Sequence, residues 1–184
     1  RRCAEAGAGA VVLKSIFEEQ IAGEVEGLVR AGTGETWHPE AEEYIARYGR
    51  EDAVRAYLDL IREAKKAVSI PVLASSHCVT GERWTDFARR AEDAGADGLE
   101  LNVFVLPSDP RRDGAANEQV YFDIAGEVTD KVGIPVALKI GSYFSGLSQT
   151  VVKLSHTGVR GLVLFNRFFR IDFDIENLEV VPAN

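Results

Sequence analysis

The sequence predicts an α/β fold, a (β/α)8 TIM barrel of which this chain carries about five of the eight strands. Five short apolar runs each end in a polar or charged residue, which is typical of parallel strands covered on both faces. Helical sequence separates each run from the next, and most runs recur at the spacing of a βα unit. The strands are expected at 10–14, 70–75, 98–103, 134–140 and 161–166.

The chain is short for a closed barrel. It has 184 residues, lacks an initiating Met and begins inside what resembles the last turn of a helix, whereas an eight-stranded barrel needs roughly 250 residues. We therefore expect residues 1–184 to form one partial barrel domain, with the first strand and the last two strands missing. Because an open barrel exposes apolar edges, this stretch should fold poorly alone; a cooperative melt as a soluble monomer would contradict that.

Helices are expected where apolar residues follow helical spacing between the strands. Pro39 opens a helix that runs to about residue 48 and ends at Gly49, and the strongest helical pattern covers 51–68. Residues 16–27 are interpreted as a short helical piece, and the alternation over 169–175 indicates a strand or a hairpin. The other helices are expected at 82–93, 117–132 and 147–156.

Composition indicates an ordinary soluble globular protein with ample core-forming residues. The net charge of -8 argues against nucleic-acid and anionic-membrane partners, because both need a basic surface. No apolar run approaches the ~20 residues of a membrane span. Cys3 and Cys78 show no spacing typical of a disulfide framework or a metal site, and they fit reduced thiols in a cytoplasmic protein.

Polar and charged side chains gather where the predicted strands end, which in a (β/α) barrel is the catalytic face. Lys14 and Lys139 end two strands, and a lysine there is costly unless it meets an anion or a polar group. Asn102 and Asn166 end two others. Asparagine has low strand propensity, and its donors and acceptors suit the imide edge of a flavin or pyrimidine ring. The same edge carries two serines, Ser15 and Ser75.

Structural roles for these residues stay open. Either lysine could extend its ammonium to solvent at the rim of the barrel, and either asparagine could cap the loop that follows it. Glu100 lies two residues before Asn102 and therefore points to the same face of the sheet. It could pair with Lys14 or Lys139 in a purely structural role.

Four segments agree in order, spacing and strand placement with one known family. They are Val-Leu-Lys-Ser at 12–15, Leu-Glu-Leu-Asn at 99–102, Val-Ala-Leu-Lys-Ile at 136–140 and Val-Leu-Phe-Asn at 163–166. Together they resemble the dihydroorotate dehydrogenase family, over nearly the whole chain. That family is an FMN-dependent (β/α)8 barrel that oxidises dihydroorotate to orotate in pyrimidine biosynthesis. The resemblance implies a flavoprotein oxidoreductase that acts on CH–CH groups and transfers hydride between substrate and FMN.

The resemblance also implies roles for individual residues. Lys14 and Ser15 look like the lysine and hydroxyl residue that meet flavin and substrate, and Asn102 resembles the asparagine that contacts both. Lys139 looks like the lysine beside the flavin ring, where positive charge would stabilise the anionic reduced flavin. Asn166 resembles a substrate-binding asparagine. The implied catalytic set is thus Lys14, Asn102, Lys139 and Asn166, and the implied FMN-binding set is Lys14, Ser15, Asn102 and Lys139, with no metal.

The general base of the family pattern is absent from this sequence. In the family, the segment after the fourth-strand asparagine carries the Cys or Ser that acts as general base. Here residues 103–109 read Val-Phe-Val-Leu-Pro-Ser-Asp, with neither residue at that position. The chain therefore looks like a divergent dihydroorotate dehydrogenase-like branch. The candidates for a replacement base are Ser108, Asp109, His77 and Cys78.

Two alternative functions remain. The chain could be a flavin-binding family member without dihydroorotate dehydrogenase activity, because the base is absent. It could also be a Schiff-base lyase barrel, with Lys139 or Lys14 as the nucleophile. In each case the expected partner is a small molecule, dihydroorotate or a related heterocycle, with no nucleic acid and no membrane. A homodimer of the full-length protein is left open.

Overall fold

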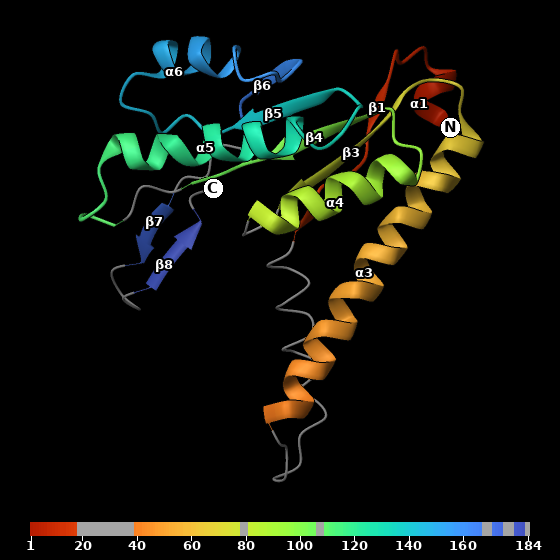
Figure 1. The fold of residues 1–184 in the computed structure, drawn as a ribbon, viewed down its shortest axis with the longest axis horizontal. Helices are drawn as coiled ribbons and strands as arrows, with labels where there is room; N and C mark the ends of the chain where they lie inside the picture. The colour runs from red at the N-terminus through yellow and green to blue at the C-terminus, as the bar shows by residue number, and fades with distance from the viewer. Residues whose placement is uncertain (18–38, 78–80, 106–108, 167–170, 175–178, 183–184) are drawn as a thin grey trace.

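The protein is half of a (β/α) barrel, which confirms the predicted fold class. The computed structural model describes residues 1–17, 39–77, 81–105, 109–166, 171–174 and 179–182. Within them, parallel strands pair side by side in a curled sheet (Figure 1). Their order is β1 (Val11–Val12), β3 (Val72–His77), β4 (Gly98–Asn102), β5 (Val136–Ile140) and β6 (Gly161–Leu164), and the short β2 (Ile16–Phe17) pairs with β3 beyond β1.

Helices pack against one face of this sheet (Figure 1). After the short α1 (Arg2–Glu5), they are α3 (Pro39–Ala67), α4 (Gly81–Asp93), α5 (Gly114–Thr129) and α6 (Leu147–Leu154). The apolar core lies between these helices and the strands, where burial of large side chains supplies most of the stability. Its largest fully buried apolar members are Trp84, Ile61, Leu99, Leu101, Leu138, Ile140 and Leu154.

Alternation along each strand decides which residues are left for the other, concave face. Leu99 and Leu101 belong to the core, so Glu100 and Asn102 point away from the helices. Asn102 is in register with Lys139 on β5, and the β3–β4 register brings His77 to the same level. The carboxyl ends of three neighbouring strands therefore present a histidine, an asparagine and a lysine in one row.

The predicted strands and helices occur within a few residues of their expected bounds, with two corrections. Gly49 does not end a helix, because α3 runs through it without a break. One glycine costs only about 1 kcal/mol relative to alanine, and a second helix would need a new, unfavourable nucleus. Residues Ile16–Phe17 form the strand β2 and are not helical, while 18–27 lie outside the described residues.

Two other features refine the prediction. Helix α5 starts three residues earlier than expected, because the Asp113 carboxylate caps it by accepting from the Ala116 amide at 2.7 Å. The alternation over 169–175 corresponds to β7 (Ile171–Asp174), which pairs antiparallel with β8 (Glu179–Pro182).

One extra residue is inserted between β1 and β2, and it shapes the concave face. Val12 is in register with Leu73, but Ile16 is in register with Ser76, so the β1–β2 side is longer by one residue. This bulge interrupts the ladder beside Ser75. The hydroxyl of Tyr57 on α3 replaces the missing ladder partners of Ser75. It accepts from the Ser75 amide at 2.9 Å and donates to the Ser75 carbonyl at 3.0 Å.

The environment of Tyr57 keeps this hydroxyl protonated. Burial raises the pKa of Tyr57 to about 12, with only a partial offset from its hydrogen bond to Ser75. The hydroxyl can therefore donate and accept at any pH at which the protein is ordinarily studied.

We expect Tyr57→Phe to lower the free energy of unfolding by about 1–3 kcal/mol, because it leaves the amide and carbonyl of Ser75 without partners in a buried position. Urea denaturation of both proteins measures the difference. A loss of less than about 0.5 kcal/mol, the size expected for an ordinary surface substitution, would contradict the role given to Tyr57.

Candidate functional site

Seven polar side chains form a connected set at the carboxyl ends of the strands. They come from the β1–β2 bulge, from β3, β4 and β5, and from the residues after β6. Hydrogen bonds link each of them to at least one other member or to its backbone. The set consists of Ser15, Ser75, His77, Glu100, Asn102, Lys139 and Asn166.

The hydrogen bonds in this set run in one direction, toward Glu100. Ser75 Oγ donates to Glu100 Oε1 at 2.8 Å, and a hydroxyl has a single proton. Ser75 must therefore accept from Ser15 Oγ, which lies 2.6 Å away. Ser15 in turn accepts from Asn102 Nδ2 at 3.4 Å. From the other side, Lys139 Nζ donates to the same Glu100 oxygen at 2.7 Å.

Asn102 is the centre of the site and is 2% exposed. Its side-chain oxygen Oδ1 accepts from Asn166 Nδ2 at 2.7 Å, so its amide nitrogen is the atom that faces Ser15. Its backbone carbonyl lies 2.6 Å from Nδ1 of His77. One residue at the end of β4 thus connects the segment after β6, the bulge beside β1 and the last residue of β3.

Glu100 and Lys139 form a largely buried ion pair, with 8% and 19% of their side chains exposed. Glu100 is in register with Ala137, which precedes Lys139 by two residues on the same face. Because Ala137 is small, the lysine stem can lie across it and reach the carboxylate. The pair also explains how a carboxylate is accommodated on a buried strand, since an unpaired charge there would be strongly destabilising.

The structure leaves Lys14 outside this set. Its side chain is exposed, and it makes no hydrogen bond or ion pair with any other residue in the described part of the chain. The extra residue between β1 and β2 explains why Lys14 lies outside the set. Without the extra residue, Lys14 would lie opposite Ser75, but the register of β2 brings Ser15 to that position.

The other residues expected from the sequence are brought together. Ser15, Asn102, Lys139 and Asn166 join the hydrogen-bonded set, and Glu100 pairs with Lys139, the second of its two expected partners. Tyr57 was not expected to support the site. Its only signal in the sequence is a polar tip on the apolar side of a helix, which many tyrosines share.

The candidate bases are in different situations. His77 belongs to the hydrogen-bonded set, whereas Cys78 and Ser108 lie outside the described residues. Asp109 is exposed and bonded to Arg111 at 2.9 and 3.0 Å, and this partner lowers the pKa of the Asp109 carboxyl. A carboxylate held in that way is a weak proton acceptor.

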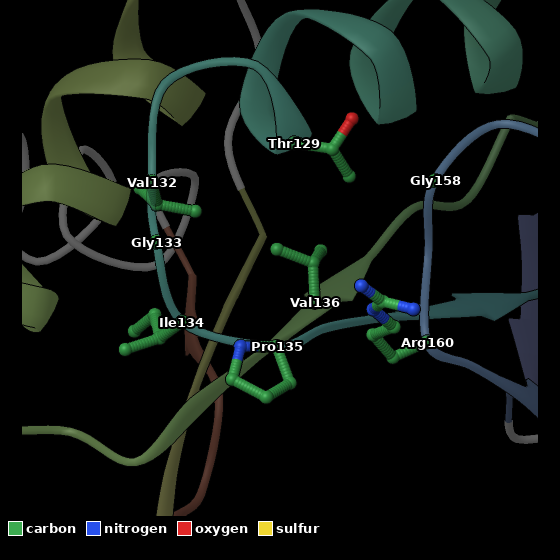
Figure 2. Close-up of a pocket in the computed structure, with 8 residues that line it drawn as sticks. All are labelled: Thr129, Val132, Gly133, Ile134, Pro135, Val136, Gly158 and Arg160. Atoms are coloured by element: carbon green, nitrogen blue, oxygen red, sulfur yellow. The ribbon is translucent and has the colours of Figure 1, made fainter.

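A separate hollow of about 210 Å³ lies at the opposite end of the strands. Figure 2 shows Thr129 from the end of α5 and Arg160 from the segment before β6 on either side of Val136. Pro135, just before the amino end of β5, also lines it. This is the end of a barrel that ordinarily contributes stability and not catalysis.

Over the described ranges, no group of three or more His, Cys, Asp and Glu side chains is placed to hold a metal ion. None of the helices seen there combines the length and the apolar composition needed to cross a membrane.

Comparison with protein families and curated proteins gives one relevant likeness. No family model matches the chain. A protein of Aeropyrum pernix named "Putative dihydroorotate dehydrogenase A (fumarate)" is 28% identical over 145 residues. The match covers 76% of this chain and 44% of that protein, so the chain spans less than half the length of its relative.

Solved structures resemble the chain in fold. A structure titled a putative dihydrodipicolinate synthetase from Pseudomonas aeruginosa has a TM-score of 0.47 and 17% identity, covering 83% of this chain and 54% of that one. A chloride-inhibited dihydrodipicolinate synthase from Acinetobacter baumannii, complexed with pyruvate, has a TM-score of 0.45 and 19% identity, covering 83% and 53%. Likenesses of this size carry no argument about chemistry. All three proteins bear the names of enzymes.

We expect Lys139→Met to lower the free energy of unfolding by about 3 kcal/mol, because it leaves the Glu100 carboxylate buried without its counter-charge. The double variant Glu100→Gln/Lys139→Met should recover more than half of that loss, since the buried charge is then gone as well. Chemical denaturation of the three proteins measures both effects.

Lys153→Met is the control for the loss of a lysine at an exposed position of α6, with an expected change below about 0.5 kcal/mol. A double variant no more stable than Lys139→Met would show that Lys139 and Glu100 are not coupled in the folded protein.

Proposed function

We propose that the concave face is the active-site surface of an FMN-dependent oxidoreductase that resembles dihydroorotate dehydrogenase. Its substrate would be a small planar heterocycle, dihydroorotate or a related molecule. The observation that carries this proposal is the Lys139 ammonium beside the paired amides of Asn102 and Asn166, all at the carboxyl ends of barrel strands. The name of the Aeropyrum pernix relative supports the same chemistry.

The chemistry of these donors fits the ring of a flavin. The pyrimidine edge of that ring presents alternating donors and acceptors, which amides and hydroxyls can match. Asn102, Asn166 and Ser15 supply such groups on the concave face. The ring gains negative charge when it is reduced, and Lys139 supplies a cation there. When bound, FMN would supply the two-electron acceptor for substrate oxidation.

The residues of the chain would act by binding and orienting. The Lys139 ammonium has three donors, of which one is directed at Glu100. The remaining donors can serve an acceptor on the ring or the substrate. Glu100 and Ser75 hold the ammonium in place, and this preorganisation is what makes a fixed charge effective in a site that excludes water.

A Schiff-base lyase is the second candidate, and one observation favours it. Lys139 is a primary amine on the concave face, and the Glu100 carboxylate 2.7 Å away could take a proton from it. A lysine nucleophile must be neutral when it attacks a carbonyl. The ion pair with Glu100, however, is the arrangement expected of a lysine that acts as a fixed cation, as the oxidoreductase requires.

The first test is the visible absorption spectrum of the full-length protein, purified and mixed anaerobically with dihydroorotate. We expect a flavin spectrum that bleaches when dihydroorotate is added. A flavin spectrum that persists would support a flavin-binding protein with another substrate or with no dehydrogenase activity. A protein that does not bind added FMN would contradict the oxidoreductase and leave the lyase.

Two substitutions of Lys139 separate the two chemistries. Lys139→Arg keeps a positive charge that can pair with Glu100, but it cannot form a Schiff base. For the oxidoreductase we expect Lys139→Arg to retain FMN and measurable flavin reduction, and Lys139→Met to lose at least about tenfold in either property. For the lyase, both variants would be inactive, and borohydride with pyruvate would label only the wild-type protein. FMN content and reduction in Lys139→Met equal to those of the wild type would refute the role of Lys139.

A further inference from the structure

A line of two hydroxyls leads from the surface of the site to the Glu100 carboxylate. Glu100 is 7% exposed, and Ser75, which donates to Glu100 Oε1 at 2.8 Å, is 1% exposed. Ser15 comes next, with its Oγ 2.6 Å from Ser75 Oγ, and it is partly exposed. Ser15 is therefore the end of this hydroxyl line that a small molecule can touch, and Glu100 is the buried end.

The protons of the hydroxyl line all point inward. Because Ser75 Oγ donates its single proton to Glu100, Ser15 Oγ must donate to Ser75. Ser15 Oγ also accepts from Asn102 Nδ2 at 3.4 Å. A hydroxyl oxygen has two lone pairs, so the second lone pair of Ser15 has no donor in the described ranges of the chain. A proton that reaches Ser15 Oγ can thus be matched by the shift of each hydroxyl proton along one hydrogen bond, toward Glu100.

Glu100 is the group on this line that can hold the proton. In its ion pair with Lys139 it is a carboxylate, which has only acceptor sites, and both Ser75 Oγ and Lys139 Nζ are directed at its Oε1. A carboxylic acid is far more stable than a hydroxyl with an additional proton. A proton that enters at Ser15 would therefore leave both serines as ordinary hydroxyls and make Glu100 the acid.

The exposed end of the hydroxyl line and the ammonium lie on opposite sides of Asn102. Asn102 is in register with Lys139 on β5, and its Nδ2 contacts Ser15 on the other side. The side chains of Glu100 and Asn102 point away from the helices, because they alternate with core residues of β4. A planar ring bound against Asn102 would therefore have the Ser15 hydroxyl near one edge and the Lys139 ammonium near the other.

We propose that Ser15 Oγ is the atom that accepts the substrate proton, and that Ser75 relays a proton to Glu100, which stores it. The inference rests on the proposed function and deepens it. As a substrate C–H bond breaks, its proton passes to Ser15 Oγ, the Ser15 proton to Ser75 Oγ and the Ser75 proton to Glu100 Oε1. The electron pair of the broken bond forms the new C=C bond. The neighbouring carbon gives up a hydride, with two electrons, to FMN, which is the oxidant.

The same proton transfer changes the charge balance beside the ring. Before the reaction the Glu100 carboxylate balances the Lys139 ammonium. Once Glu100 holds the proton, the ammonium has lost this counter-charge, and it does so as the hydride brings negative charge to the ring. The cation is thus most effective when the charge that it stabilises develops. Product bound against Ser15 keeps the proton on Glu100, and after product release the proton returns to solvent through the same hydroxyls.

Ser15→Ala and Ser75→Ala each remove one hydroxyl of the line and leave both members of the ion pair in place. We expect both variants of the full-length protein to keep FMN and to lose about 10²- to 10⁴-fold in the rate of flavin reduction by dihydroorotate. The double variant should lose no more than either single variant, because one gap already interrupts the line. Ser15→Thr, which restores a hydroxyl, should recover most of the loss seen in Ser15→Ala. Ser155→Ala, at an exposed serine outside the site, is the control and should not change the rate.

A purely structural role for the hydroxyls gives a different result. If Ser15 only orients Asn102, Ser15→Ala should weaken the binding of FMN or orotate, while the rate of reduction at saturating dihydroorotate stays near that of the wild type. That result would overturn the proposal. A large loss of rate in Ser15→Ala that Ser75→Ala does not share would equally overturn it, because the proton would then not travel through Ser75.

Infrared spectroscopy gives a readout apart from activity. Reduction with dithionite in the presence of orotate prepares the reduced, product-bound protein without turnover of dihydroorotate. In the wild type this complex should gain the C=O band of a protonated carboxylic acid relative to the oxidised protein, and Glu100→Gln should lack that band. No such band in the wild type, or an equal band in Glu100→Gln, would show that Glu100 does not store the proton.

Failure of the proposed function has a different signature. A wild-type protein that binds no FMN, or whose FMN dihydroorotate does not reduce, removes the oxidation and the proton transfer together. A wild-type protein that is reduced by dihydroorotate, with Ser15→Ala and Ser75→Ala reduced at the same rate, removes only the role of the hydroxyl line.

Discussion

The ion pair between Glu100 and Lys139 is the interaction on which the concave face depends. Glu100 is a charged group on a buried strand, and it is acceptable there because a lysine and a serine both donate to it. Its charge also sets the direction of the hydrogen bonds around it. Ser75 donates to it, Ser15 must therefore donate to Ser75, and Asn102 is turned so that its amide nitrogen faces Ser15. One carboxylate thus orients side chains from three separate segments.

The helices on the other face of the sheet stabilise this arrangement. At the bulge beside β1, the backbone of Ser75 has lost its ladder partners, and the hydroxyl of Tyr57 on α3 replaces both of them. The bulge and the tyrosine belong together, since an unsatisfied amide and carbonyl at a buried position would be costly. The result is that Ser15 enters the site, while Lys14 stays exposed.

The ion pair between Glu100 and Lys139 also bears on whether Lys139 acts as a cation or as a nucleophile. In the proposed oxidoreductase, Lys139 acts as a cation beside a bound ring, and the ion pair with Glu100 holds that cation in place. In a lyase, the same side chain would instead act as a nucleophile on a carbonyl.

The sequence alone determined the barrel fold, the strand positions and which residues of the candidate site meet at the strand ends. Near-continuous apolar runs followed by polar residues are a local signal, and in a parallel sheet the ends of the strands must meet at one edge. For that reason Ser15, Asn102, Lys139 and Asn166 could be placed together without coordinates. The features that only the tertiary structure decided depend on residues that are distant in the sequence. The continuity of α3 through Gly49, the insertion at Lys14 and the choice of Lys139 as partner of Glu100 follow from register, packing and side-chain reach, and no local pattern encodes them.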